Sequence, residues 1–258
     1  MASQQPTSFI QTVIGKIAVY QKEIDSNKIP IIFLHGVYFD HHLWDKVIDS
    51  LNDRTIIALD MPFHGLSKEI TKTDWTLNDC ADMLLEIMNR LHITKVIAVG
   101  HSWGSMTILR AASRRPELFE SVLLCNMPFL KATTKQKLTF GLQHSMLIFR
   151  NFYTKQAAKV LFGKTSLKEN PSLVDQLKQS MNLLSNAQIK TTDKAVIINA
   201  DDASELIKNL KVRALALKGI EDYVPAPPSI ETLIIGGGHI SPLEQPHEII
   251  SLVHKLSN

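Results

Sequence analysis

The sequence predicts an α/β fold, in which a mostly parallel sheet is covered by helices on both faces and carries one helical insertion. Short runs of β-branched residues alternate with segments of helical periodicity, which is typical of parallel strands joined by crossover helices. This alternation breaks once, over 127–195, where no convincing strand is found. A chain of 258 residues, 45% hydrophobic and 21% charged, is long and apolar enough for a substantial core.

The individual elements follow in order along the chain. Two runs that flank Gly15 predict an antiparallel hairpin, at 8–13 and 16–21. The other predicted strands are 29–35, 55–60, 95–100, 121–126, 212–219 and 231–237. One helix is expected from Leu77 to Leu91, where apolar residues recur at helical spacing after Thr76, a residue type that caps helix N-termini. Two more helices are expected, at 102–114 and 246–256.

The insertion is predicted to be a helical cap over 127–195, within a core formed by 1–126 and 196–258. Helical patterns dominate it, at 135–152 and 173–184. It leaves the sheet at the carboxyl end of a parallel strand, the edge at which such folds bind ligands. We therefore expect the cap to lie over a binding crevice.

Charge is distributed unevenly between these two parts. The cap holds eleven basic and three acidic residues, a net charge of +8, so the rest of the chain carries −5 of the overall +3. The overall charge is too small to indicate nucleic-acid binding, and no basic stripe with interleaved aromatic residues is present. A basic cap favours an acidic partner, because positive patches steer negative ones.

Several classes of protein are disfavoured by composition. Cys80 and Cys125 lie far apart within apolar runs, so neither a disulfide framework nor a zinc site is expected. The first residues lack the basic and apolar regions of a secretory leader. No apolar run approaches the roughly 20 residues that span a bilayer. We expect a cytoplasmic protein without a membrane span, either a monomer or a dimer.

The segment Gly100–Gly104 has the pattern G-x-S-x-G between a predicted strand and a predicted helix. A tight strand–turn–helix forces the central serine into a strained backbone, and the flanking glycines remove side chains that would clash. Ser102 is then exposed at a helix N-terminus, where free N–H groups favour a developing oxyanion. The context predicts that Ser102 is a nucleophile.

A serine nucleophile requires a base, which in turn is oriented by an acid. His239 follows the last predicted strand and Asp222 the strand before it, so both belong to the same sheet edge as Ser102. The chain order Ser102, Asp222, His239 is the one expected for this architecture. Glu221 stays a minor alternative for the acid, whereas the amide of Asn126 could not stabilise an imidazolium as a carboxylate does.

The oxyanion hole is predicted to consist of two backbone N–H groups, those of Val37 and Trp103. Trp103 directly follows the nucleophile, and Val37 lies in the loop after the third strand. The side chains expected to line the substrate pocket are Trp103, Tyr38, Phe129 and Phe149. His64 and His101 flank the site and are expected to hold loops rather than to transfer protons.

Taken together, the motifs resemble those of the α/β-hydrolase superfamily over nearly the whole chain. They are HG at 35–36, Trp44, DMPFHGLS at 60–67, GHSWG at 100–104, GIEDYVP at 219–225 and GGGH at 236–239. The resemblance implies an eight-stranded, mostly parallel sheet and a Ser102–His239–Asp222 triad. Two departures stand out. Phe63 replaces the glycine that the family usually has before His-Gly, and the seventeen-residue spacing from Asp222 to His239 leaves no room for the usual helix.

These residues predict a serine hydrolase that cleaves a carboxylic ester through an acyl-enzyme on Ser102. No cofactor is expected, because GGGH lacks the spaced glycines and the helix that dinucleotide binding needs. No metal is expected either, because the adjacent His41 and His42 should point apart. A small-molecule esterase or lactonase and a non-catalytic receptor of the same fold are the alternatives.

The substrate prediction depends on the cap. In size and charge the chain is similar to the esterases that hydrolyse the methyl ester of pimeloyl-acyl carrier protein in biotin synthesis, whose basic cap receives an acidic carrier. That resemblance implies carrier binding by residues of the cap, namely Lys131, Lys135, Lys137 and Arg150.

Overall fold

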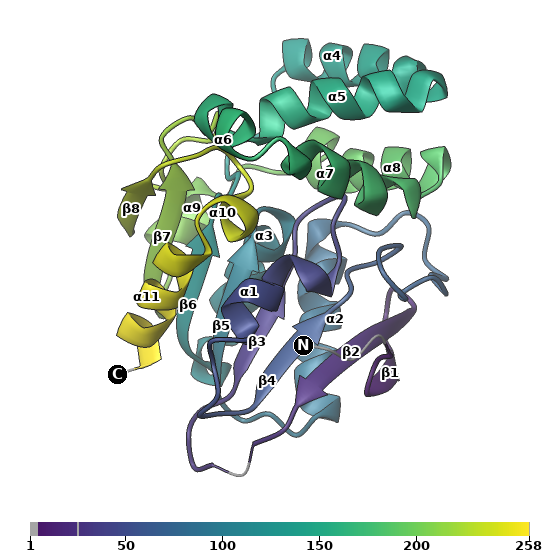
Figure 1. Ribbon diagram of the computed structural model, residues 1–258. Coiled ribbons are helices and arrows are strands. Elements are labelled where there is room, and N and C mark those ends of the chain that lie inside the picture. The colour runs from purple at the N-terminus through teal and green to yellow at the C-terminus, as the bar shows by residue number, and fades with distance from the viewer. Residues whose placement is uncertain (1–4, 25, 258) are drawn as a thin grey trace.

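The computed structural model describes residues 5–24 and 26–257, and its centre is an eight-stranded sheet in the order β1-β2-β4-β3-β5-β6-β7-β8 (Figure 1). The hairpin of β1 and β2 and the β2–β4 pair are antiparallel, and every other pair is parallel. The strands are β1 (Ser8–Gln11), β2 (Lys16–Lys22), β3 (Ile31–Leu34), β4 (Ile56–Leu59), β5 (Val96–His101), β6 (Phe119–Cys125), β7 (Arg213–Gly219) and β8 (Glu231–Ile235). The predicted fold class is therefore confirmed. Residues 1–4 and 258 lie outside the described residues. The predictions about a secretory leader and about the bounds of the core partly concern these residues.

Helices cover both faces of the sheet, which explains why every residue of β3, β4 and β5 is buried (Figure 1). One face carries α1 (Asp45–Ile48), α10 (Ser241–Glu244) and α11 (Pro246–Ser257). The other carries α2 (Leu77–Arg90), α3 (Trp103–Arg114) and α9 (Ser204–Lys208), and two 3₁₀ turns, η1 (His41–Trp44) and η2 (Pro116–Leu118), lie in connections. The predicted N-cap Thr76 forms a reciprocal capping box with Asp79.

The edge strand β8 is only partly covered. As the spacing of Asp222 and His239 predicts, the described residues between β7 and β8 form no helix. Leu233 and Ile234 of β8 are consequently 38% and 50% exposed. Because consecutive strand residues point to opposite faces, both faces of the edge strand are partly bare in the single chain. The dimer stays a prediction.

Between β6 and β7 the chain forms a layer of helices above the carboxyl ends of the strands (Figure 1). They are α4 (Thr134–Ser145), η3 (Met146–Phe149), α5 (Arg150–Leu161), α6 (Lys164–Glu169), α7 (Ser172–Asn182), α8 (Asn186–Asp193) and η4 (Lys194–Ile198). The expected cap boundary at 195 falls inside η4. Within 5–24 and 26–257, no helix is long and apolar enough to cross a membrane.

The stretch predicted to be helical over 135–152 is helical but not continuous, because η3 divides it into α4 and α5. The backbone of Phe149 leaves the helical region at φ −101° and ψ 62°. The break buries Leu147, while Met146 and Ile148 on either side stay exposed. Helical periodicity alone did not reveal it, since both halves satisfy the same pattern.

The turn after β4 is built around the buried carboxylate of Asp60. It accepts hydrogen bonds from the Tyr20 hydroxyl at 2.7 Å, the Leu66 N–H at 2.8 Å and His41 Nδ1–H at 2.9 Å. Phe63, where the family pattern has glycine, adopts the left-handed φ of 70° that glycine would adopt more easily. Its ring lies beside Trp75, 6.5 Å between ring centroids, so the bulky residue is absorbed by packing.

The buried carboxylate of Asp60 allows a prediction of how the stability of the fold depends on pH in the acid range. Burial, the largest single influence, would raise the pKa of Asp60, but the hydrogen bond and charge of His41, together with the charge of His35 and the Leu66 N–H, outweigh burial and lower the pKa from 3.8 to about 2. A depressed carboxyl pKa stabilises the fold above pH 3.8, here by roughly 2.5 kcal/mol, and this contribution is lost as the pH falls through 2. We expect Asp60→Asn to lower the free energy of unfolding at neutral pH by about this amount or more.

The measurement is urea unfolding of both proteins across the acid range. The difference between wild type and Asp60→Asn should shrink as the pH falls from 3.8 towards 2, because protonation removes the charge that the variant lacks. A difference that stays constant over this range would show that the carboxylate charge contributes nothing.

Candidate active site

Ser102 lies in the turn between β5 and α3 with a strained backbone, φ 49° and ψ −110°. The flanking glycines permit this turn. A side chain on Gly104 would overlap the backbone carbonyl of Leu34, and one on Gly100 would come within 2.5 Å of the Ser105 N. The Ser102 N–H donates to the Cys125 carbonyl of the neighbouring strand at 2.8 Å. The local sequence thereby fixes the serine at the N-terminus of α3.

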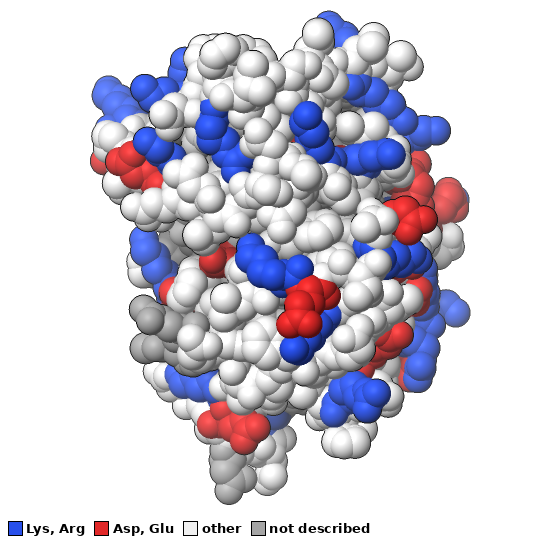
Figure 2. All heavy atoms as spheres, turned by 90° about the vertical axis from the view of Figure 1, so that its right-hand side faces the viewer, with Lys and Arg blue, Asp and Glu red and all other residues white. Residues whose placement is uncertain are grey.

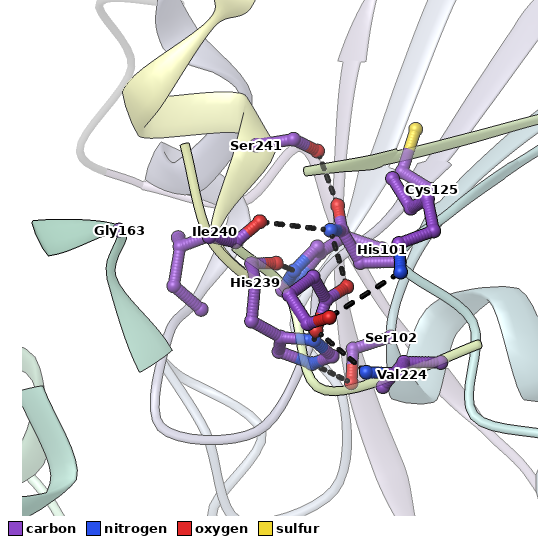
Figure 3. Close-up of polar contacts among 12 residues, drawn as sticks. His101, Ser102, Cys125, Gly163, Val224, His239, Ile240 and Ser241 are labelled. Carbon is purple, nitrogen blue, oxygen red and sulfur yellow. Dashed lines mark hydrogen bonds and ion pairs between the residues drawn. The ribbon is translucent and has the colours of Figure 1, made fainter. Parts of the chain in front are cut away.

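The structure brings Ser102, His239 and Asp222 together at the carboxyl edge of the sheet (Figure 3). The Ser102 Oγ lies 2.9 Å from His239 Nε2, and His239 Nδ1 lies 2.9 Å from Asp222 Oδ1. All three residues are buried, with at most 7% of their surface exposed. The Nδ1–H donates to the carboxylate, so Nε2 is free to accept the serine proton.

Asn126 supports the acid rather than replacing it. Its Nδ2 donates to Asp222 Oδ2 at 2.8 Å and to the Gly238 carbonyl at 3.1 Å. The Asp222 carboxylate also accepts the Val224 N–H at 3.1 Å. Burial alone would raise the pKa of Asp222, but His239, Asn126 and the Val224 N–H together lower it. The carboxylate is therefore ionised in neutral solution.

Glu221, the alternative acid, faces away from His239. Its carboxylate accepts the N–H groups of Lys164 at 2.8 Å and Thr165 at 3.3 Å, at the start of α6. Free N–H groups at a helix N-terminus favour such an anion. The structure thus overturns the alternative and gives Glu221 a role in attaching the cap.

A second carboxylate, which the sequence analysis missed, attaches the cap to the histidine loop. Glu244 accepts N–H groups from Gly163 of the cap at 2.9 Å and from Gly238 at 2.8 Å. The His239 N–H itself donates to the Leu161 carbonyl at 2.6 Å. No sequence motif reveals these contacts, because they join segments that are distant along the chain.

The two predicted oxyanion donors lie in elements that flank Ser102. Trp103 is the first residue of α3, so its N–H has no acceptor within the helix. Val37 follows Gly36, which lies so close to the nucleophile that an added Cβ would be 3.2 Å from Ser102 Cβ. The turn after β3 therefore presents its backbone beside the serine.

Neutral histidines hold these loops. His64 Nε2 accepts the Tyr38 N–H at 3.1 Å, and burial, reinforced by the charge of His35, lowers the pKa of His64 to about 3. His101 Nε2–H donates to the His239 carbonyl at 2.7 Å, and burial and the neighbouring His239 lower the pKa of His101 to about 3. An uncharged His64 is required, since only a neutral ring accepts a backbone N–H.

With this geometry established, the family assignment follows from comparison with known proteins. The family model described as "alpha/beta hydrolase fold" matches residues 29–168. The chain belongs to the α/β-hydrolase family. It is 27% identical over 259 residues to a Bacillus subtilis protein named uncharacterized hydrolase YugF, covering 93% of each chain.

Solved structures share this fold over nearly their whole length. The enol-lactonase from Burkholderia xenovorans superposes with a TM-score of 0.84 at 16% identity, covering 96% of this chain and 99% of that one. A thermophilic esterase from Thermogutta terrifontis gives a TM-score of 0.81 at 18% identity, covering 97% and 99%.

The four residues predicted to bind substrate do not form one surface in this α/β-hydrolase. Trp103 is fully buried and stacks on Trp75, 5.3 Å between ring centroids, so its indole packs the core. Phe129 is also buried, whereas Phe149 is 63% exposed on the cap. Phe149 lies at the end of η3, so it does not share a buried surface with the other three residues.

Tyr38 links the oxyanion turn to the cap. Its hydroxyl donates to Asp193 Oδ1 at 3.0 Å, and His144 Nε2–H donates to Asp193 Oδ2 at 2.9 Å. The Tyr153 hydroxyl lies 3.4 Å from that of Tyr38. Burial raises the pKa of Asp193, although the bonds from His144 and Tyr38 act in the opposite direction. This buried cluster fixes the tyrosine as a structural contact rather than a free pocket wall.

Tyr223 is a neighbour of the triad that the sequence analysis did not single out. Its ring stacks on the His239 imidazole, 4.9 Å between centroids and 24° between planes, while 59% of the residue is exposed. The one sequence feature that could have indicated this contact is that Tyr223 directly follows Asp222. The ring covers one face of the base and leaves Nε2 directed at the serine.

The four predicted carrier-binding residues differ in their environment. Lys131 and Lys135 are exposed and Lys137 is half-buried. Arg150 instead donates hydrogen bonds to the carbonyls of Met181 and Leu184 and to the Asn186 side chain. Its guanidinium is engaged inside the cap, so the expected docking role of Arg150 is replaced by a structural one.

One group among the described residues has metal-ligand spacing. Asp40, His41 and His42 place potential ligand atoms within 4.8 Å of one another at the start of η1. The expectation that the two histidines point apart is wrong, because their rings lie 4.0 Å apart with a 36° tilt. His41 Nδ1 bonds Asp60 and His42 Nδ1 bonds Asp45, so both rings are oriented by carboxylates. The group belongs to η1 and the Asp60 turn rather than to the Ser102 site.

Proposed function

We propose that this α/β-hydrolase is a serine hydrolase that cleaves carboxylic esters through an acyl-enzyme on Ser102. The observation that carries the proposal is the chain of two 2.9 Å hydrogen bonds from Ser102 through His239 to Asp222. Nucleophile, base and orienting acid are each within the distance that this chemistry requires. The strained serine at a helix N-terminus adds the expected environment for an oxyanion.

Each step of the reaction has a group in this chain. Ser102 Oγ attacks the ester carbonyl as His239 Nε2 takes its proton, and the charge of Asp222 stabilises the imidazolium. The oxyanion is bound by the N–H groups of Trp103 and Val37. His239 then protonates the departing alcohol, which leaves the acyl group on Ser102. Water, deprotonated by His239, then attacks the acyl-enzyme. The bond from the acyl carbon to Ser102 Oγ breaks, His239 returns the proton to Oγ, and the carboxylic acid is released.

Esters or lactones are the substrate class that the comparisons support. The similar structures include proteins titled enol-lactonase and esterase. Turnover of p-nitrophenyl esters of increasing acyl length, beside a lactone series, would define the acyl group. The same assay separates esterase from lactonase activity.

The decisive experiment is labelling with a fluorophosphonate, which reacts covalently with an activated serine. Wild type should gain one adduct on Ser102, located by mass spectrometry of the peptides. Ser102→Ala should gain none and should hydrolyse no ester. A folded wild-type protein whose Ser102 stays unlabelled would contradict the proposal and favour the non-catalytic receptor.

A second candidate is the methyl ester of an acyl group on acyl carrier protein, as in biotin synthesis. The basic cap and the exposed Lys131 and Lys135 support it. Charge reversal of Lys131, Lys135 and Lys137 should slow carrier-linked turnover at low salt and leave free esters unaffected. Equal rates for the carrier-linked substrate before and after the reversal would remove this candidate.

A further inference from the structure

The first part of the cap has an unusual charge composition. Residues 127–168 contain no aspartate or glutamate and eight basic residues. Lys131, Lys135, Lys155 and Lys159 are exposed. In the side view of Figure 2, basic side chains stand among uncharged ones along the top of the molecule, and the acidic side chains in view begin lower down.

The same segment concentrates exposed apolar side chains. Of the sixteen large hydrophobic residues that are exposed in the described chain, eight lie within 127–168. They are Leu130, Leu138, Leu142, Met146, Ile148, Phe149, Phe152 and Val160. Monomeric soluble proteins seldom gather exposed apolar side chains in this way unless the patch binds something.

Helix α4 carries part of this exposed apolar surface. None of its twelve residues is buried, although Leu138 and Leu142 are apolar and 67% and 73% exposed. Lys135, Leu138 and Leu142 share one face, since residues three and four apart are neighbours on a helix. A helix of this length is marginal without packing, so contact with a partner surface would stabilise it. Figure 1 places α4 as the outermost element of the cap.

We propose that this surface, formed by α4, η3 and the start of α5, docks the protein on an anionic lipid bilayer. The apolar side chains of Leu142, Ile148 and Phe149 enter the acyl boundary, and the flanking lysines contact anionic headgroups. This combination is the one by which amphipathic helices lie in a membrane interface. Docking goes beyond the proposed hydrolase activity and does not depend on Ser102.

Two other occupants fit less well. A second copy docked through this face would bring two clusters of cations together, and like charges repel. An acidic protein satisfies the charge, but a protein partner needs a complementary groove, whereas Leu138, Leu142 and Ile148 are 67%, 73% and 75% exposed on the cap. A bilayer accepts projecting apolar side chains without a complementary shape.

The test is co-sedimentation of the full-length protein with phosphatidylcholine vesicles, with and without phosphatidylglycerol. We expect binding only when phosphatidylglycerol is present, and weaker binding at high salt. The double variant Lys135→Glu/Lys155→Glu should weaken partitioning about fivefold or more per lysine. Leu138→Ser/Leu142→Ser should weaken it about tenfold or more per leucine, and it should fold, because neither side chain is buried.

Matched controls lie outside the cap. Lys46→Glu in α1 and Ile234→Ser in β8 change the same residue classes at exposed positions and should leave partitioning unchanged. Ser102→Ala should bind vesicles like wild type, so failure of docking and failure of the hydrolase chemistry are distinguishable. Absence of binding to phosphatidylglycerol vesicles overturns the proposal, as does equal loss in the controls. Binding to polyglutamate but not to vesicles also overturns it and favours an acidic protein.

Discussion

Replacing Asp222 by asparagine is expected to lower kcat for ester hydrolysis about 10⁴-fold, whereas replacing the adjacent Glu221 by glutamine should leave kcat within about tenfold of wild type. Both changes replace a carboxylate by an amide of the same shape, one residue apart. Only Asp222 contacts His239, and only Glu221 contacts the amides of α6. The comparison therefore separates catalysis from attachment of the cap.

The large effect of Asp222→Asn is expected because both carboxylate oxygens accept hydrogen bonds from donor groups. Asp222 Oδ1 accepts from His239 Nδ1–H and the Val224 N–H, and Oδ2 accepts from Asn126 Nδ2. In Asp222→Asn, the amide NH₂ replaces one of these two oxygens. At either position it faces a group that is itself a hydrogen-bond donor. If it faces His239, the ring shifts its proton to Nε2 and can no longer accept the Ser102 proton. The ionised state of Asp222, whose pKa is lowered in the fold, is lost as well.

The measurement is single-turnover acylation together with the rate of fluorophosphonate labelling. Thermal unfolding of both variants checks that they are folded. Asp222→Asn with near wild-type kcat would exclude this carboxylate from the mechanism. A loss in Glu221→Gln as large as in Asp222→Asn would show that attachment of the cap, rather than the charge at His239, controls the rate.

The sequence predicted the sheet and the close approach of Ser102, His239 and Asp222, because both depend on local pattern and chain order. Buried parallel strands such as β3 and β5 read as continuous apolar runs. Ser102 directly follows β5, Asp222 and His239 lie in the loops after β7 and β8, and the carboxyl ends of neighbouring parallel strands meet at one edge. Strand assignment alone was therefore enough to bring these residues together.

The cap resisted prediction because its contacts are long-range and its residue types are ordinary. Nothing local to Asp193 indicates that it receives a hydrogen bond from Tyr38, which lies 155 residues earlier. From the sequence, Arg150 is indistinguishable from a surface cation. Its hydrogen bonds to the carbonyls of Met181 and Leu184 depend on how the cap helices pack. The 3₁₀ turn η3 was hidden for a similar reason, since burial of Leu147 depends on the helices packed around it.

A second large effect is expected from the smallest change in the oxyanion turn, Gly36→Ala. The added Cβ would overlap His101 Nδ1 and approach Ser102 Cβ at 3.2 Å. The turn must then move, and with it the Val37 N–H. Loss of one oxyanion donor typically lowers kcat about 10²- to 10³-fold, and we expect a decrease of that size. The effect should appear in kcat rather than in KM, because the donor acts mainly on the charge that develops in the transition state.

Gly141→Ala is the matched control for this prediction. A Cβ on Gly141 meets nothing within 4 Å, and the residue lies in α4, where alanine favours the helix by up to about 1 kcal/mol. Activity should therefore be unchanged and thermal stability equal or higher. If Gly36→Ala kept full kcat while remaining folded, the turn after β3 would not hold an oxyanion donor. The close approach of Gly36 to Ser102 is the observation that places this turn beside the reacting carbonyl. If that observation proved irrelevant to kcat, the second oxyanion donor would have to lie outside residues 35–38.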